Sequence, residues 1–144
     1  MLKGKRTQLI DGIIYEKAPQ GKPHRLTVNR VMRHLYQRFG SEHTINVQNG
    51  FPADESSMPE PDVFVSRGPL EDYEADGADF FPDTILLLIE VADSSVRTNR
   101  TLSLEKYARS GIAEFWIINL PDGSVEQYTG PKTLESEEGV IRGY

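Results

Sequence analysis

The chain has 144 residues, of which 38% are hydrophobic, and we expect residues 1–144 to form a single domain with its own core. It has no cysteine, which excludes disulfides and thiolate zinc sites and favours a reducing, cytoplasmic location. The formal net charge of -6 argues against a nonspecific polyanion binder, and the longest apolar run, about seven residues, is too short to span a membrane.

The sequence of residues 8–40 indicates a hairpin followed by a helix. Residues 8–10 and 13–17 flank Asp11-Gly12, a strong two-residue turn signal. A helix is predicted over residues 24–39, with Gly40 as its C-terminal cap. Its apolar positions recur at helical spacing, and they are Leu26, Val28, Val31, Met32, Leu35, Tyr36 and Phe39.

The other side of this helix is basic. The residues that define it are Arg30, Arg33, His34 and Arg38. Such a face is usually the wet side of an amphipathic helix. Its functional interpretation is a patch that contacts phosphates.

The rest of the chain predicts a mixed α/β arrangement. Its predicted strands are residues 44–51, 62–66, 84–92, 114–119 and 124–128. A helix is predicted over residues 99–110, ending at Gly111. A loose tail or a frayed last strand is predicted over residues 130–144. The helix between the strands 84–92 and 114–119 predicts a right-handed crossover that joins parallel strands. We therefore expect a mixed sheet with at least one helix on each face.

Glu90 is the most informative residue, because it ends the most apolar strand of the chain. An isolated carboxylate in a strand that is buried on both faces costs several kcal/mol unless it is paired, protonated or bound to a metal. Asp62 follows Pro61 at the head of another predicted strand, so two acids on neighbouring strands suggest a divalent-cation site. The alternative for Asp62 is a turn residue. The alternative for Glu90 is a buried ion pair with Arg97, Arg100 or Lys106.

Several short motifs become recognisable in this order. They are EVADSS from Glu90, YARSGI from Tyr107 and EFWIIN from Glu114, together with Pro61-Asp62-Val63 and the early Asp11-Gly12 with His24. Residues 9–128 thereby resemble the Uma-type restriction endonuclease family of the PD-(D/E)XK nuclease superfamily. The resemblance implies a restriction-endonuclease-like α/β fold, a mixed β-sheet flanked by helices, and a metal-dependent activity on DNA phosphodiester bonds.

The resemblance also implies a ligand set. Asp62 matches the motif aspartate and Glu90 the second acid, and both would hold Mg²⁺ or Mn²⁺, with the Val91 carbonyl oxygen as a further ligand. The superfamily lysine falls at Ala92, which cannot serve, and in this family it is moved onto the following helix.

The chain departs from the family on that helix. The usual acid is Asn99 here, and the usual lysine is Ser103. Lys106 lies three residues further, on a neighbouring part of the same helix face, so its amine could replace the missing one. The alternative is a solvated helix lysine.

Phosphodiester hydrolysis needs a positioned water and groups that stabilise the charge on the phosphate. Two acids and one amine, namely Asp62, Glu90 and Lys106, are the minimum set. Glu16 could complete the metal shell, or it could be a solvated strand-end residue. His24 could contact a phosphate or the metal-bound water, or it could be a structural residue at the start of a helix.

Three functions remain open from the sequence. The leading one is a Mg²⁺- or Mn²⁺-dependent endonuclease that hydrolyses DNA, acting either alone or as a homodimer. The second is a catalytically impaired nuclease-fold protein that binds nucleic acid or protein, which Asn99 and Ser103 favour. The third is a structural dimerisation domain that pairs through an exposed strand edge.

Overall fold

The computed structural model describes residues 5–93, 96–136 and 139–143. The chain begins with the predicted hairpin, in which β1 (Thr7–Ile10) pairs with β2 (Ile13–Glu16) in antiparallel register. Asp11 and Gly12 both have positive φ angles, of 50° and 77°, as the tight turn between twisted strands requires. The hairpin predicted from Asp11-Gly12 is therefore confirmed.

The centre of the molecule is a five-stranded sheet with the order β3-β4-β5-β6-β7. Its strands are β3 (Thr44–Val47), β4 (Val63–Ser66), β5 (Ile85–Ala92), β6 (Glu114–Asn119) and β7 (Ser124–Thr129). β5 and β6 are parallel, and the other neighbours are antiparallel. The helix α2 (Val96–Arg109) connects β5 to β6, so the predicted crossover between parallel strands and the mixed sheet are confirmed.

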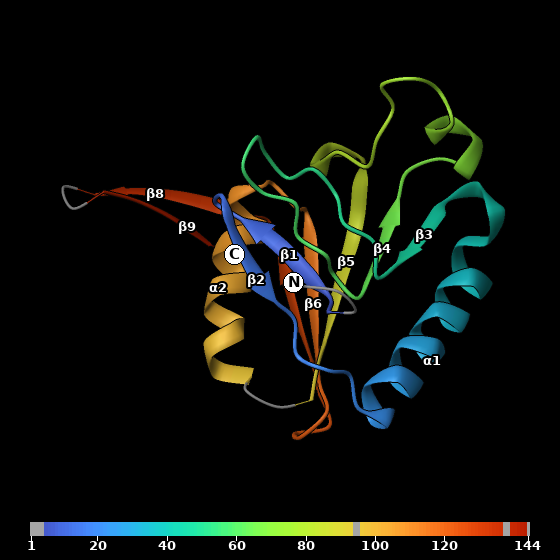
Figure 1. The fold of residues 1–144 in the computed structure, drawn as a ribbon, viewed down its shortest axis with the longest axis horizontal. Coiled ribbons are helices and arrows are strands. Elements are labelled where there is room, and N and C mark those ends of the chain that lie inside the picture. The colour runs from blue at the N-terminus through green and yellow to red at the C-terminus, as the bar shows by residue number, and fades with distance from the viewer. Residues whose placement is uncertain (1–4, 94–95, 137–138, 144) are drawn as a thin grey trace.

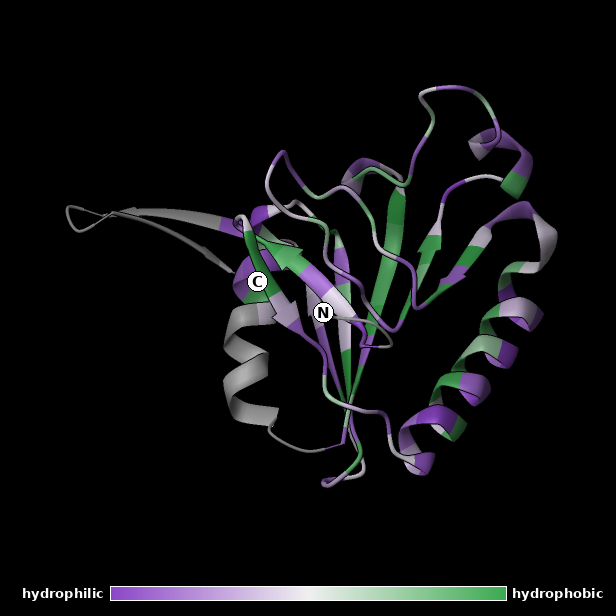
Figure 2. Cartoon of the chain, in the orientation of Figure 1, coloured by the Kyte–Doolittle hydropathy of each residue, from purple (hydrophilic) through white to green (hydrophobic). Residues whose placement is uncertain are grey.

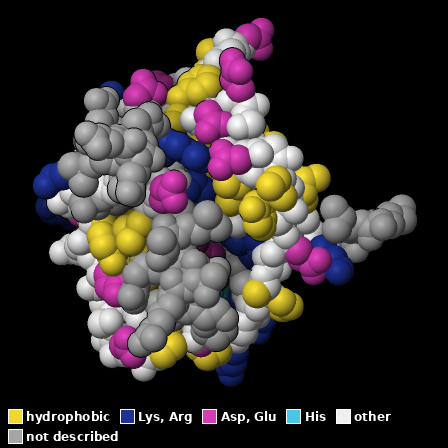
Figure 3. All heavy atoms as spheres, turned by 90° about the vertical axis from the view of Figure 1, so that its left-hand side faces the viewer, with side chains coloured by type: hydrophobic (Ala, Val, Ile, Leu, Met, Phe, Trp, Pro, Cys, Tyr) yellow, Lys and Arg dark blue, Asp and Glu magenta, His cyan; other side chains and the backbone are white. Residues whose placement is uncertain are grey.

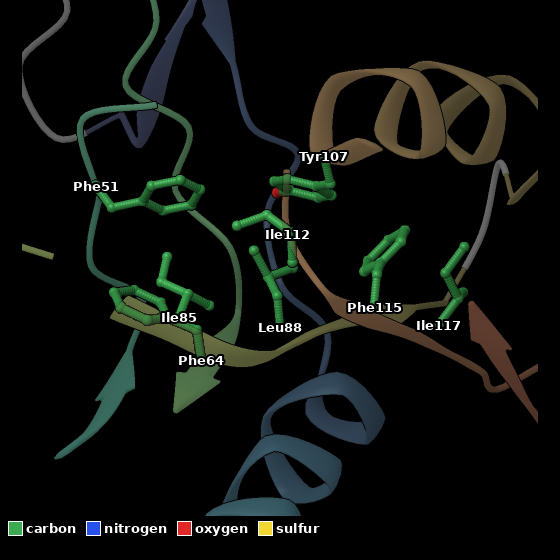
Figure 4. Close-up of a cluster of buried hydrophobic side chains, with 8 residues drawn as sticks. All are labelled: Phe51, Phe64, Ile85, Leu88, Tyr107, Ile112, Phe115 and Ile117. Carbon is green, nitrogen blue, oxygen red and sulfur yellow. The ribbon is translucent and has the colours of Figure 1, made fainter. Parts of the chain in front are cut away.

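The two long helices cover opposite faces of this sheet (Figure 1). α1 (Lys22–Phe39) packs Val28 and Leu35 against one face, and α2 packs Tyr107 against the other. The cluster on the α2 side joins aromatic and aliphatic side chains from the sheet, the helix and the loops (Figure 4). Short 3-10 helices lie in the connections, at Gly40–Glu42, Leu70–Tyr73 and Pro82–Thr84.

β5 lies deepest in the molecule. Leu88 belongs to the cluster on the α2 side and Ile89 to the cluster on the α1 side, so both faces of the strand are buried, as predicted. Figure 2 shows β4 and β5 as the largely hydrophobic centre of the sheet. Glu90 lies two residues after Leu88, and its side chain therefore points to the α2 face.

The observed elements differ from the predicted ones at their ends. α1 begins at Lys22, two residues early, because Pro23 is tolerated in a first turn where its missing N–H is not needed. β3 ends at Val47, since Gln48 has a φ of 54°, which extended strands do not allow. α2 begins at Val96 instead of residue 99.

Two apolar residues that we expected in the core of α1 are exposed, namely Leu26 and Tyr36. Leu26 lies nine residues before Leu35, which is two and a half helical turns, and it therefore points away from the sheet. The C-terminal region differs too. β8 (Lys132–Ser136) and β9 (Gly139–Gly143) form an antiparallel hairpin where a loose tail or a frayed last strand was predicted, and the hairpin projects from the body of the molecule (Figure 1).

In the part of the chain that the structure describes, no helix combines the length and the apolar character that crossing a membrane requires. The single domain over residues 1–144 and the cytoplasmic location stay predictions.

Candidate active site

A cleft of about 310 Å³ lies between the N-terminal hairpin, the start of α1, the end of β5 and α2. It gathers every residue that the sequence singled out for the site. These residues are Glu16, His24, Asp62, Glu90, Val91, Ser103 and Lys106. Since they come from positions up to ninety residues apart, the fold itself brings the predicted site together.

Asp62 is buried directly before β4. Its Oδ2 accepts a 2.8 Å hydrogen bond from the amide of Val91 and lies 3.2 Å from Nε2 of His24. Burial pushes the pKa of the Asp62 carboxyl up, but the hydrogen bonds from His24 and Val91 outweigh it and hold the pKa below its usual value. Asp62 is therefore ionised although it is buried. A turn residue at the surface would be ionised without such hydrogen bonds.

Glu90 has the opposite electrostatic environment. Burial raises the pKa of its carboxyl, and the negative charge of Asp62 raises it further. The hydroxyl of Tyr107 donates a 2.7 Å hydrogen bond to Oε1 of Glu90, and the charges of Lys17 and Lys106 partly offset the rise. The two acids thus lie close enough to repel each other in a partly dry cleft.

Lys106 is turned into the cleft. Only 4% of the residue is exposed, and its Nζ lies 4.4 Å from the centre of the Tyr107 ring. Burial lowers the pKa of this amine to about 8, with Glu90 opposing the shift and Lys17 adding to it. The alternative of a solvated helix lysine is therefore wrong. Ser103, one turn earlier, is half-buried and also lines the cleft.

The side chains of three other residues named in the sequence analysis lie outside the described part of the chain. They are Arg97, Asn99 and Arg100.

The two accessory residues differ in their placement. Glu16 is half-exposed at the mouth of the cleft and pairs with Lys5 at 3.1 Å, as the solvated alternative predicted. His24, in the first turn of α1, is buried against Asp62, while its Nδ1 is also buried and has no hydrogen-bond partner. An unpaired buried nitrogen is costly, so His24 has one polar atom left for another group.

The sequence reasoning missed Lys17 and Gln20. Both lie in the linker between β2 and α1 and line the cleft. The positive charge of Lys17 favours the ionised forms of Asp62 and Glu90. Nε2 of Gln20 lies 3.5 Å from Oδ1 of Asp62, and its Oε1 accepts a 2.7 Å hydrogen bond from Gln48. The only signal in the sequence was their place in the loop before His24.

The donor set suits a hard divalent cation. No group of three or more His, Asp or Glu side chains arranged to hold a metal occurs among residues 5–93, 96–136 and 139–143. Mg²⁺, however, keeps most of its waters and is bound through one or two carboxylates plus substrate phosphate. Asp62 and Glu90 meet that requirement, and a cation between them would relieve their repulsion.

Comparison with known proteins identifies the fold and the family of the chain. A solved structure titled as a putative nuclease belonging to DUF820 from Anabaena variabilis ATCC 29413 shares the fold, with a TM-score of 0.55 and 16% sequence identity over 92% of this chain and 82% of that one. No curated protein matches the chain. The sequence pattern of the Uma2 family, described as "Putative restriction endonuclease", matches residues 1–141 and supports a nuclease. The chain therefore belongs to the Uma2 family.

Proposed function

We propose that this protein is a Mg²⁺- or Mn²⁺-dependent endonuclease that hydrolyses DNA phosphodiester bonds. One observation carries the proposal: Asp62, Glu90 and Lys106 come from three separate segments of the chain and line one cleft, where the two acids repel each other and the amine is buried. Buried charges of this kind are costly to keep, and they cluster at functional sites.

Asp62 and Glu90 would hold the ion, with the Val91 carbonyl oxygen as the further ligand. The bound ion supplies Lewis-acid stabilisation of the phosphate and makes the attacking water more acidic. The hydrogen bonds from Val91 and His24 fix the Asp62 carboxylate in one orientation and keep it ionised. The Tyr107 hydroxyl orients Oε1 of Glu90 and partly offsets the rise in the pKa of that carboxyl.

Lys106 supplies the amine that the family pattern places at position 103. With a pKa of about 8, its Nζ is neutral in a fraction of molecules near pH 7 and is able to accept a proton from the attacking water. Once protonated, the same nitrogen offsets the charge that develops on the phosphate. His24 Nδ1, which is buried and unpaired, would donate to a phosphate oxygen when the imidazole carries a proton on both nitrogens.

The alternative is an impaired nuclease fold that binds nucleic acid or protein without cutting. Ser103 favours it, because the family lysine is missing from a position that lines the cleft. The burial of Lys106 in the same cleft favours the active enzyme. The homodimer stays a prediction, which a measurement of the molecular mass in solution would test.

The decisive experiment titrates Mn²⁺ calorimetrically into the wild-type protein, Asp62→Asn and Asp83→Asn. Asp83 is exposed and outside the cleft, so its variant controls for the loss of one acid. We expect binding to the wild type and to Asp83→Asn but not to Asp62→Asn. Cleavage of duplex DNA in Mn²⁺, absent in EDTA and in Lys106→Met, then separates the enzyme from the binding module. Mn²⁺ binding that survives Asp62→Asn would refute the site.

A further inference from the structure

The helix α1 carries charge of one sign only. It holds none of the 22 acidic residues of the chain, although the formal net charge is -6. Five of the 16 Lys and Arg residues lie on it, namely Lys22, Arg25, Arg30, Arg33 and Arg38. A long helix without a single acid is unexpected in an acidic protein, where mixed charges are the usual way to solvate a helix face.

These cations are exposed and largely unneutralised. In the described part of the chain, salt bridges pair Arg6 with Glu60 and Arg109 with Asp11, but none involves a Lys or Arg of α1. Arg25 donates a hydrogen bond to the carbonyl oxygen of Gln20 and keeps its charge. The surface thus presents like charges that repel one another and that a polyanion would compensate.

The basic residues follow the side of α1 that faces away from the sheet. Arg33 lies two residues before the buried Leu35, which places it on the opposite side of the helix. Lys22 and Arg33 are eleven residues apart, or three turns, so they share one line along about 16 Å of the helix axis. We call Lys22, Arg25, Arg30 and Arg33 the basic strip.

The basic strip begins at the candidate active site. Gly21 and His24, on either side of Lys22, both line the cleft, and α1 then runs along one side of the sheet (Figure 1). The α2 side of the molecule differs, because acidic, basic and hydrophobic side chains are mixed on its described part (Figure 3). At the far end of α1, the loop that contains Glu71 and Asp72 is joined to β3 by a 3.0 Å hydrogen bond from Thr44 to Gly68. Negative charge therefore lies near the end that is distant from the cleft.

We infer that the basic strip binds the sugar-phosphate backbone of a nucleic-acid duplex while the cleft holds the phosphate to be cut. This inference rests on the proposed function and adds the surface that receives the flanking part of the substrate. Cations in a row contact successive phosphates without reading the bases. Leu26 and Tyr36, which are exposed on the same side of α1, add contact area beside the strip.

The test measures binding of a fluorescently labelled duplex of about 20 base pairs by anisotropy, in EDTA, over about 50 to 200 mM salt. It compares Arg30→Gln/Arg33→Gln with Arg67→Gln/Lys132→Gln, in which both residues are also exposed but lie outside α1. Each double variant removes two positive charges. We expect the α1 variant to bind about three- to tenfold more weakly, with a salt dependence reduced by about two phosphate contacts, and the control to bind as the wild type does.

A charge-preserving variant, Arg30→Lys/Arg33→Lys, should retain most of the affinity, because phosphate contacts need charge more than a planar fork. Three results would overturn the inference: a wild type that binds no duplex, an equal loss in both double variants, or an α1 variant that loses affinity for phosphatidylserine vesicles but none for the duplex. Circular dichroism checks that each variant is folded.

Failure of the inference can be told apart from failure of the proposed function. Bis(p-nitrophenyl) phosphate is too small to reach Arg30 and Arg33 from the cleft, so its Mn²⁺-dependent hydrolysis should be unchanged in Arg30→Gln/Arg33→Gln and lost in Asp62→Asn. Duplex binding that depends on the strip, without any hydrolysis, would support the inference and refute the nuclease. Hydrolysis of bis(p-nitrophenyl) phosphate without duplex binding that depends on the strip would support the nuclease and refute the inference.

Discussion

The amide of Val91 donates a 2.8 Å hydrogen bond to Oδ2 of Asp62 and so ties the start of β4 to the end of β5. The antiparallel register pairs Val63 with Ile89, and continuing it by one residue brings Asp62 opposite Glu90. A shift of one residue would turn one acid to the other face of the sheet. The register of two strands thus decides whether a cation site exists at all.

Removing the amine of Lys106 should abolish hydrolysis. Lys106→Met keeps an unbranched side chain of similar length but removes the Nζ that lies over the Tyr107 ring, so we expect the fold to be retained while the rate falls about 100-fold or more. The measurement is cleavage of duplex DNA and of bis(p-nitrophenyl) phosphate in Mn²⁺. Lys132→Met, a change at an exposed lysine, is the control. An undiminished rate in Lys106→Met would refute the role of the amine.

Restoring the family residue at position 103 should increase activity. Ser103 lines the cleft one turn before Lys106, so the amine of Ser103→Lys can reach the same space. We expect Ser103→Lys/Lys106→Met to recover at least tenfold over Lys106→Met alone, since general acid–base groups contribute about 100-fold or more. Ser103→Met/Lys106→Met controls for side-chain bulk. If Ser103→Lys/Lys106→Met and Ser103→Met/Lys106→Met cut equally slowly, an amine at position 103 does not replace the amine of Lys106.

Glu90 should cost stability at neutral pH. Burial and the charge of Asp62 raise the pKa of Glu90 in the folded protein above its unfolded value. The free energy of unfolding therefore falls as the pH rises from the unfolded to the folded pKa of this carboxyl. Glu90→Gln keeps an oxygen for Tyr107 and should raise Tm by about 3 °C at pH 7, while Mn²⁺ binding is lost. Thermal unfolding with and without Mn²⁺ measures both effects. A lower Tm in the metal-free variant would contradict the electrostatic account.

His24 should stabilise the fold in a pH-dependent manner. The pKa of Asp62 is held below its usual value of 3.8, so its ionised form contributes stability above that pH, and this contribution is lost as the pH falls through the folded pKa. His24→Ala removes one of the groups responsible and should cost about 2 kcal/mol at pH 7 and much less near pH 3. Urea unfolding at both values tests this. A loss of equal size at both would point to packing alone.

The pH dependence of the rate should follow Lys106. Because the pKa of its amine is about 8, the rate of bis(p-nitrophenyl) phosphate hydrolysis should rise through this value and level off above it. Lys106→Arg stays protonated at all accessible pH values and should show neither the rise nor the wild-type rate. A wild-type rate that falls above pH 8 would instead assign the protonated amine to the reaction.

Much of the fold could be predicted from the sequence because its signals are local. Asp11-Gly12 specifies a turn by its own backbone preferences, and the continuous apolar run of β5 requires burial on both faces. Leu26 was misplaced because an apolar residue at helical spacing does not say how wide the buried stripe of the helix is.

The acids of the site could be predicted for a similar reason, whereas the rest of its shell could not. Glu90 conflicts with its own strand, and such a conflict is visible without a structure. Lys17 and Gln20 lie in a linker whose path depends on tertiary contacts, such as the hydrogen bond from Gln48 to Oε1 of Gln20. No local pattern marks residues of that kind.

Partners that are distant along the chain hold the N-terminal hairpin to the rest of the molecule. Leu9 bridges Met58, and Asp11 pairs with Arg109, 98 residues away. Contacts that close such long loops form slowly, so the sheet can assemble before one wall of the cleft is in place. On the proposed function, a newly made copy would therefore have its core before it is able to cut nucleic acid.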